Sequence, residues 1–223
     1  MKILRLLTVA AALALTGAPA VAATIVTYSS STGSLAPSYV GTDIYATDIM
    51  RGAALNEARS DSLASRDWSQ ATSMDDAIKA GSYLTWGFKS VVPLALESFG
   101  IAFQRSPQGP QSIALQMAVN GGPWSLLFDF HAPDFTHNSA WIASAAFPEL
   151  LDVTNAMFRF VGWNAGNQAG TLLLPDSKVL DGHAFTLTGS TMVAIPVPPA
   201  LPLLGGGLLL LGLLAHRRRK AAA

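Results

Sequence analysis

The chain has 223 residues, no cysteine, and as many Lys and Arg as Asp and Glu, fourteen of each. The absence of cysteine excludes disulfide staples, zinc–thiolate sites and cysteine nucleophiles. Six of the cations lie in two terminal segments, and without these segments eight cations face fourteen acids, a net charge of −6. Such an acidic domain lacks the clustered Lys and Arg that phosphate backbones require, so we expect no nucleic-acid partner.

The N-terminal residues have the layout of a secretory signal peptide. Two cations precede an apolar stretch at 6–15, and Ala20 and Ala22 place small residues at the positions that signal peptidase reads. The sequence therefore predicts a signal peptide over residues 1–22 and an exported chain that starts near Thr24.

The exported region, residues 24–190, is dominated by alternation of large apolar residues with small or polar ones. This period of two is typical of strands with one buried face, and Asn120-Gly121-Gly122-Pro123 predicts a hairpin turn between two of them. The side chains expected to point inward are Leu84, Trp86 and Phe88; Phe99, Ile101 and Phe103; Ile113, Leu115, Met117 and Val119; and Trp124, Leu126, Phe128 and Phe130. Further strands are expected at 156–163, 170–174 and 184–189. The prediction is an all-β domain, an antiparallel β-sandwich of jelly-roll type.

Some stretches depart from this alternation. Residues 48–67 are a helix candidate without a clean apolar stripe, 73–83 suit a short helix or a connecting loop, and 145–154 suit a helical turn. Arg159 interrupts an apolar strand, and we expect it to face solvent or to pair with an acid.

The densest polar cluster consists of Asp129, His131, Asp134 and His137. Histidines and carboxylates at this density could hold a divalent metal or supply an acid/base pair, but Pro133 breaks the regular spacing. The simpler interpretation is a strand end followed by a polar loop. No Gly-x-Ser-x-Gly elbow marks a Ser-His-Asp triad either. We therefore expect no metal, no cofactor and no catalytic residue. If a metal does bind, these four side chains are the candidate ligands.

Five tryptophans are many for a domain of this size, and aromatic faces can stack on ligands such as sugar rings. Trp86 and Trp124 fall on the faces predicted to be inward, and Trp163 suits either the core or its rim. Trp68 and Trp141 fall in predicted loops, so they are the candidates for exposed ligand contacts.

The C-terminal segment combines a short apolar run with a block of cations. Residues 200–215 would span about 24 Å as a helix, slightly less than the roughly 30 Å of a hydrocarbon core. Cations stay on the cytoplasmic side of a membrane. We therefore expect a transmembrane helix at 200–215 and a basic cytoplasmic tail at 216–223, oriented by Arg217, Arg218, Arg219 and Lys220. An ordinary permanent anchor is the alternative.

The segment before this helix, Val197-Pro198-Pro199-Ala200, follows another proline. The order of these parts is a proline-rich segment, a short Leu/Gly helix and an arginine cluster. It resembles the PEP-CTERM class of bacterial sorting signals, and more closely the variant of that class that reads Val-Pro-Leu-Pro-Ala. The glutamate of the Pro-Glu-Pro form is missing. The resemblance implies cleavage near the linker at 191–199 by an exosortase-type membrane protease, removal of the helix, and delivery to the cell surface or the extracellular matrix.

The exported region resembles the β-sandwich domains of PEP-CTERM secreted proteins. The matching residues are Arg51-Gly52, Arg105-Ser106 with Gly109-Pro110, Phe158-Arg159, and Gly162-Trp163-Asn164-Ala165. Three positions depart from that pattern: Ala53 replaces a glycine, Asn120-Gly121 replaces Asp-Gly, and Val161 replaces a tyrosine. The resemblance implies a jelly-roll fold and no particular chemistry.

These observations predict a non-enzymatic exported protein with a structural or adhesive role at the cell surface or in the matrix, associated with extracellular polysaccharide. Its other expected partners are signal peptidase, the exosortase-type protease and, transiently, the inner membrane. The alternative from another class is a secreted glycan-acting hydrolase or lyase centred on the four polar residues at 129–137. A third interpretation is an envelope protein that keeps its tail.

Overall fold

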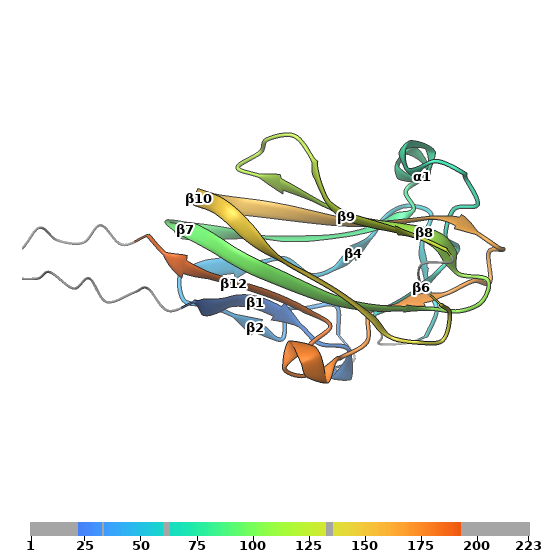
Figure 1. The fold of residues 1–223 in the computed structure, drawn as a ribbon, viewed down its shortest axis with the longest axis horizontal. Helices are drawn as coiled ribbons and strands as arrows, with labels where there is room; N and C mark the ends of the chain where they lie inside the picture. The colour runs from blue at the N-terminus through green and yellow to red at the C-terminus, as the bar shows by residue number, and fades with distance from the viewer. Residues whose placement is uncertain (1–21, 33, 60–62, 133–135, 193–223) are drawn as a thin grey trace, which may run out of the picture. The chain divides into compact units, whose positions relative to one another are not determined.

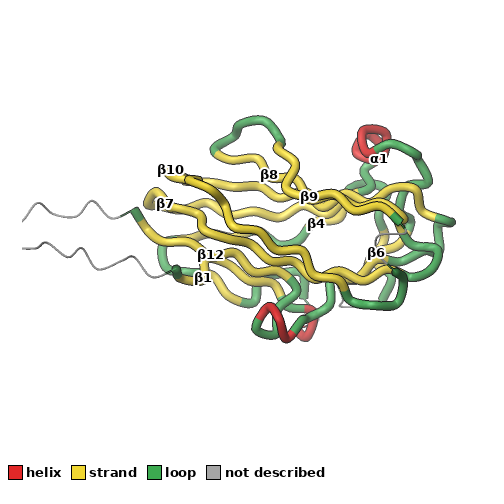
Figure 2. Tube along the Cα trace, in the orientation of Figure 1, coloured by secondary structure: helices red, strands yellow, loops and turns green. Residues whose placement is uncertain are grey.

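The computed structural model describes residues 22–32, 34–59, 63–132 and 136–192. These ranges consist mostly of strands and contain one α-helix, α1 (Met74–Ala80) (Figures 1 and 2). Within them, no helix is long and apolar enough to cross a membrane. The helix expected at 200–215 and nearly all of the expected signal peptide lie outside the described residues and stay predictions.

The strands pair throughout in antiparallel fashion. They are β1 (Ala23–Tyr28), β2 (Tyr39–Val40), β3 (Ile44–Ala46), β4 (Met50–Arg51), β5 (Asn56–Glu57), β6 (Ala64–Arg66), β7 (Tyr83–Arg105), β8 (Pro110–Val119), β9 (Ser125–His131), β10 (Trp141–Ala165), β11 (Leu172–Leu173) and β12 (Phe185–Thr191). Two short 3₁₀ turns, η1 (Ser30–Thr32) and η2 (Lys178–Leu180), lie in the connections.

The long strands β7 and β10 pair with each other along most of their length and run through both layers of the molecule. The first half of β7 pairs with β3 and β4, whereas its second half pairs with β12, which joins β1 and β2. The second half of β10 pairs with β8, and β8 pairs with β9. The result is the expected antiparallel β-sandwich, with β8 and β9 in one layer and β12, β1 and β2 in the other (Figure 2).

The change of layer occurs where both long strands are irregular. Pro93 lies in the middle of β7, and the pairing of β10 shifts register three times between Ala146 and Asn155, around Pro148. Proline has no N–H to donate to a ladder, so it favours such bends and bulges. The helical turn expected at 145–154 is therefore wrong, because these residues form the bend of β10.

The core between the layers is rich in aromatic side chains. Trp86 of β7 stacks on Phe158 of β10 at 5.8 Å between centroids and meets Phe185 of β12 edge-on at 5.2 Å. The inward faces predicted for Leu84, Trp86 and Phe88, for the stretch 99–103 and for Ile113, Leu115 and Met117 are confirmed, because all of these side chains are buried.

The N-terminal third shows one correction and one confirmation. The helix candidate at 48–67 is wrong, since its described residues form β4, β5, β6 and their turns. The short helix expected within 73–83 is confirmed as α1. Ser73 caps it by accepting a hydrogen bond from the backbone N–H of Asp76, and Gly81 ends it in the left-handed conformation.

Candidate ligand-binding face

A β-bulge in β9 decides which side chains reach the outer surface of the β8–β9 layer. Leu115 of β8 pairs with Phe128, but the next residue, Gln116, pairs with Leu126, so Leu127 is the extra residue of the bulge. A bulge rotates the side chains on either side of it to opposite faces. Phe128 and Phe130 accordingly pack against the core, whereas Leu126 is 50% exposed and the nearby Trp124 38% exposed.

The inward position predicted for Trp124 and Leu126 is therefore wrong. The preceding turn forms as predicted, with Asn120 and Gly121 at positive φ and the N–H of Gly122 donating to the carbonyl of Val119. Two consecutive leucines, Leu126 and Leu127, interrupt the alternation of apolar and polar residues in this strand. They were the sequence signal that could have indicated the bulge.

Trp124 lies against Arg159, which projects from the same outer face. The guanidinium carbon of Arg159 is 4.2 Å from the indole centroid and 5.9 Å from the ring centroid of Tyr83. Its Nε and Nη2 donate to Oε1 of Gln116 at 2.9 and 2.7 Å. We call these four residues, Tyr83, Gln116, Trp124 and Arg159, the aromatic–arginine platform.

The electrostatics of the platform follow from its partial burial. Burial lowers the pKa of Arg159, while the nearby Tyr83 and Asp75 raise it. The side chain stays charged at neutral pH, because a guanidinium loses its proton only at very high pH. Of its five N–H donors, two reach Gln116 and three donate to no described residue. Arg159 thus lies on the solvent side of the layer, as expected, where it packs against Trp124 and forms no ion pair with a described acid.

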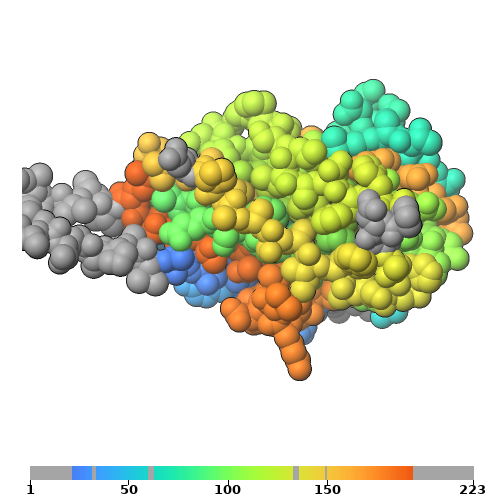
Figure 3. Space-filling model, viewed as in Figure 1, coloured from blue at the N-terminus to red at the C-terminus, as the bar shows by residue number. Residues whose placement is uncertain are grey.

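Helix α1 borders the platform on one side. Its Ala77 packs with Ala114, Val161 and Trp163 on the outer face of the layer, and Tyr83 joins the edge of this cluster. In the space-filling view the helix protrudes from the surface of the sheet (Figure 3). Leu126, directly across from Gln116, remains exposed. Trp124 is therefore the exposed member of the platform, beside the half-buried Tyr83 and Arg159 and the buried Gln116.

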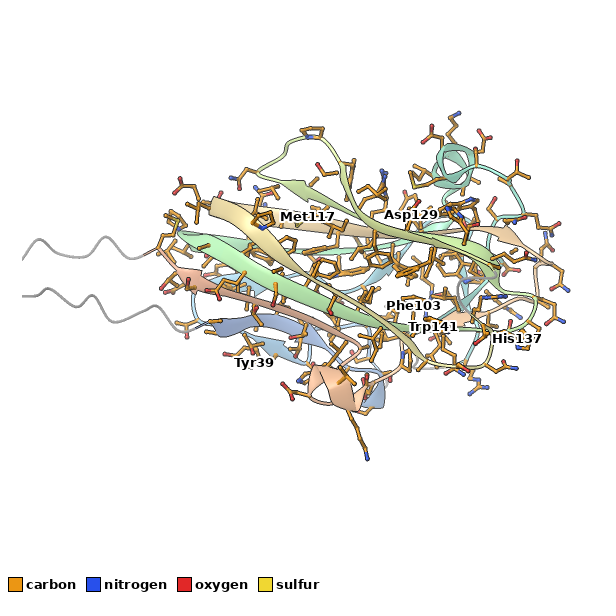
Figure 4. All side chains as sticks on the ribbon, viewed as in Figure 1. Tyr39, Phe103, Met117, Asp129, His137 and Trp141 are labelled. Carbon is orange, nitrogen blue, oxygen red and sulfur yellow. The ribbon has the colours of Figure 1, made fainter. Side chains whose placement is uncertain are left out.

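The described residues of the polar cluster at 129–137 do not gather at one point. His131 contacts Asp129 at 3.3 Å and Ser112 at 3.0 Å, and both its own side chain and that of Asp129 are about half exposed. Figure 4 draws Asp129 and His137 well apart. Asp134 lies outside the described residues, among which no group of three potential metal ligands occurs. The described residues therefore agree with the simpler interpretation of a strand end, and the metal site stays an untested alternative.

The two tryptophans predicted as exposed contacts have different positions. Trp68 is 1% exposed and its indole N–H donates to the carbonyl of Ser65 at 2.9 Å, so the ligand contact predicted for it is wrong. Trp141 is half-buried and packs against the core at the start of β10, beside Phe103 (Figure 4). Trp163, expected in the core or at its rim, is buried.

No protein-family model and no curated protein matches this chain. Similar solved structures include a xylan-binding module CBM15, with 9% identity and a TM-score of 0.39 over 77% of this chain and 97% of that one. TmCBM61 in complex with β-1,4-galactotriose has 11% identity and a TM-score of 0.32, covering 70% and 91% of the two chains. A family 35 carbohydrate binding module from Clostridium thermocellum has 14% identity and a TM-score of 0.32, covering 67% and 100%. Likenesses at this level concern the fold alone.

Proposed function

We propose that this chain is an exported, non-enzymatic protein that binds polysaccharide at the cell surface or in the extracellular matrix. The observation that carries the proposal is Trp124, a large aromatic side chain held at the surface by a charged partner instead of being buried. Tryptophan is enriched at interfaces, because its large apolar ring is combined with one polar N–H group.

The platform has the chemistry that a sugar chain needs. A sugar ring presents an apolar C–H face, which suits an indole, and a rim of hydroxyl groups, which suits fixed donors and acceptors. Arg159 contributes three N–H groups without a described partner, next to the amide of Gln116. Because Gln116 and the indole hold the guanidinium in place, little side-chain freedom remains to be lost on binding.

The terminal segments support export and sorting. Ala22 is exposed, and Ala23 pairs with Gly189, so β1 begins beside the last residues of β12. Signal peptidase would cut after Ala22 or Ala23, and an exosortase-type protease would act near Val197–Ala200. The mature protein would then carry the sandwich without its apolar helix and basic tail.

Affinity electrophoresis tests the binding part of this proposal. The purified protein is run through gels that contain xylan, β-glucan, polygalacturonate or no polysaccharide. We expect retardation by at least one polysaccharide and a loss of at least tenfold in affinity for it in Trp124→Ala. Tyr39→Ala, which removes another exposed aromatic side chain on β2 of the other layer, is the matched control and should be retarded like the wild type. No retardation in any gel, or equal retardation of Trp124→Ala, would contradict the proposal.

A further inference from the structure

A row of cross-strand neighbours runs over the outer face of the layer that carries the platform. Five residues, one on each of five strands, pair in direct register: Met50 (β4), Thr85 (β7), Arg159 (β10), Gln116 (β8) and Leu126 (β9). We call them the transverse row. Residues directly opposite each other in antiparallel strands share a face, so all five side chains lie on the outer face. With neighbouring strands about 4.8 Å apart, the row is about 19 Å long.

The two ends of the transverse row are apolar and its middle is polar. Met50 is 54% exposed and Leu126 is 50% exposed, whereas Thr85 and Arg159 are half-buried and Gln116 is buried. The Thr85 hydroxyl and the amide N–H groups of Gln116 make no hydrogen bond to a described residue. Together with the three remaining N–H groups of Arg159, they give the middle of the row several polar groups that a ligand could bind.

The surface on the two long sides of the row differs. On one side α1 covers the neighbouring positions, since its Ala77 packs with Ala114 and Val161. On the other side Gly87 pairs with Met157, and a Cβ on Gly87 would lie 2.5 Å from the Met157 sulfur. The Met157 side chain therefore occupies the space over Gly87 and makes this side apolar.

Both ends of the row are open among the described strands. There, β4 pairs only with β7 and β9 pairs only with β8, so the row runs from one edge of the layer to the other. It is also continuous with the platform, because it contains Arg159 and Gln116, and Trp124 lies against Arg159 at 4.2 Å.

We propose that a linear polysaccharide lies along the transverse row, across the strands, and that the protein binds internal segments of the chain and not its ends. A strip of this length contacts several successive sugar units. Because it is open at both ends, it accepts the middle of a long chain, whereas recognition of a chain end requires a closed pocket. Met50 and Leu126 suit the C–H faces of sugar rings, and the polar middle suits their hydroxyl groups. This proposal gives the mode of binding within the proposed function and rests on it.

Isothermal titration with chains of increasing length tests the proposal. The probes are dimer-to-hexamer series of xylose, of β-1,4-linked glucose and of galacturonate, together with the three polymers. We expect a hexamer to bind at least thirtyfold more tightly than the dimer of the same sugar, more than repetition of the dimer along the chain alone gives. Each polymer chain should bind more than two protein molecules. Equal affinity for dimer and hexamer, or saturation at the two chain ends, would overturn the proposal.

Met50→Ala tests the end of the row that is farthest from Trp124. It should weaken binding of the hexamer at least threefold, and Met50 is exposed, so circular dichroism should show the wild-type fold. The matched control is Val179→Ala, which shortens another exposed apolar side chain, on η2 outside the row. It should bind the hexamer like the wild type. Unchanged binding of the hexamer in Met50→Ala would refute the row.

The same titrations separate this proposal from the proposed function. If Trp124→Ala and Met50→Ala both weaken binding of the hexamer, the row is supported. If Trp124→Ala abolishes this binding and Met50→Ala leaves it intact, the row is refuted and the platform stands. If the wild type binds none of the polymers or oligomers, the proposed function itself fails, and the row fails with it.

Discussion

At the scale of single residues, a tight contact explains why Trp68 is in the core. A Cβ on Gly162 would lie 2.5 Å from Cε3 of Trp68, closer than atoms of two side chains approach. Gly162 therefore leaves the space that the indole fills, and the N–H of Trp68 finds its partner in the carbonyl of Ser65. The Gly162-Trp163-Asn164-Ala165 stretch thus has a packing role, independent of any ligand.

Gly162→Ala should destabilise the protein by about 1–3 kcal/mol, because an added methyl group in a filled core forces side chains or backbone to shift. Urea unfolding followed by tryptophan fluorescence measures the change. Gly166→Ala is the control, since a Cβ there meets its nearest described atom at 3.4 Å, an ordinary contact. Equal stability of Gly162→Ala and wild type would show that the Trp68 packing is looser than described.

At the scale of elements, a carboxylate joins two connections that are far apart in the sequence. Asp176, before η2, accepts hydrogen bonds from the backbone N–H groups of Ser30 and Ser31 in η1 at 2.6 and 2.9 Å, and from the Ser29 hydroxyl at 2.8 Å. Burial alone would raise the pKa of Asp176, but these hydrogen bonds together lower it below its ordinary value of 3.8. The ionised form is therefore the one that stabilises the fold.

Asp176→Asn should lower the stability at pH 7 by about 1.5–3 kcal/mol, the range for a lost hydrogen bond to a charged group. Since the folded-state pKa is the lower one, this contribution is complete above the unfolded-state pKa and disappears as the pH falls through the folded-state value. The difference between variant and wild type should thus shrink below about pH 4 in urea unfolding. Asp181→Asn, which loses no described side-chain hydrogen bond, is the control. A difference that does not change with pH would contradict this role of the carboxylate.

A helix or strand could be predicted from the sequence where the residues that determine it are close together in the chain. The strands around Trp86, Ile101 and Leu115 were predictable, because period two alone assigns their faces. The bulge at Leu127 was not, since it depends on register against β8, and it moved Trp124 from the predicted core to the surface. Residues 48–67 carry too weak a periodicity to reveal short strands that form only against β7 and β11.

The candidate sites were even less predictable, because they combine distant parts of the chain. The platform joins Tyr83, Gln116, Trp124 and Arg159, which do not form a motif in sequence. The cluster that did stand out, at 129–137, is dense in sequence, but its described residues do not converge in space (Figure 4).

At the scale of the whole sandwich, β1 begins beside the end of β12 (Figure 1). A protein processed at both termini would keep the platform, because its four residues lie outside the segments predicted to be removed. The central claim is that Trp124 makes contact with a polysaccharide.

The most direct test is an NMR titration that follows the indole N–H signals of the five tryptophans while the polysaccharide fragment that the protein binds is added. We expect the Trp124 signal, assigned through its loss in Trp124→Ala, to shift most strongly, while those of the buried Trp68 and Trp86 stay in place. Binding that leaves the Trp124 signal unmoved would show that the polysaccharide does not contact Trp124.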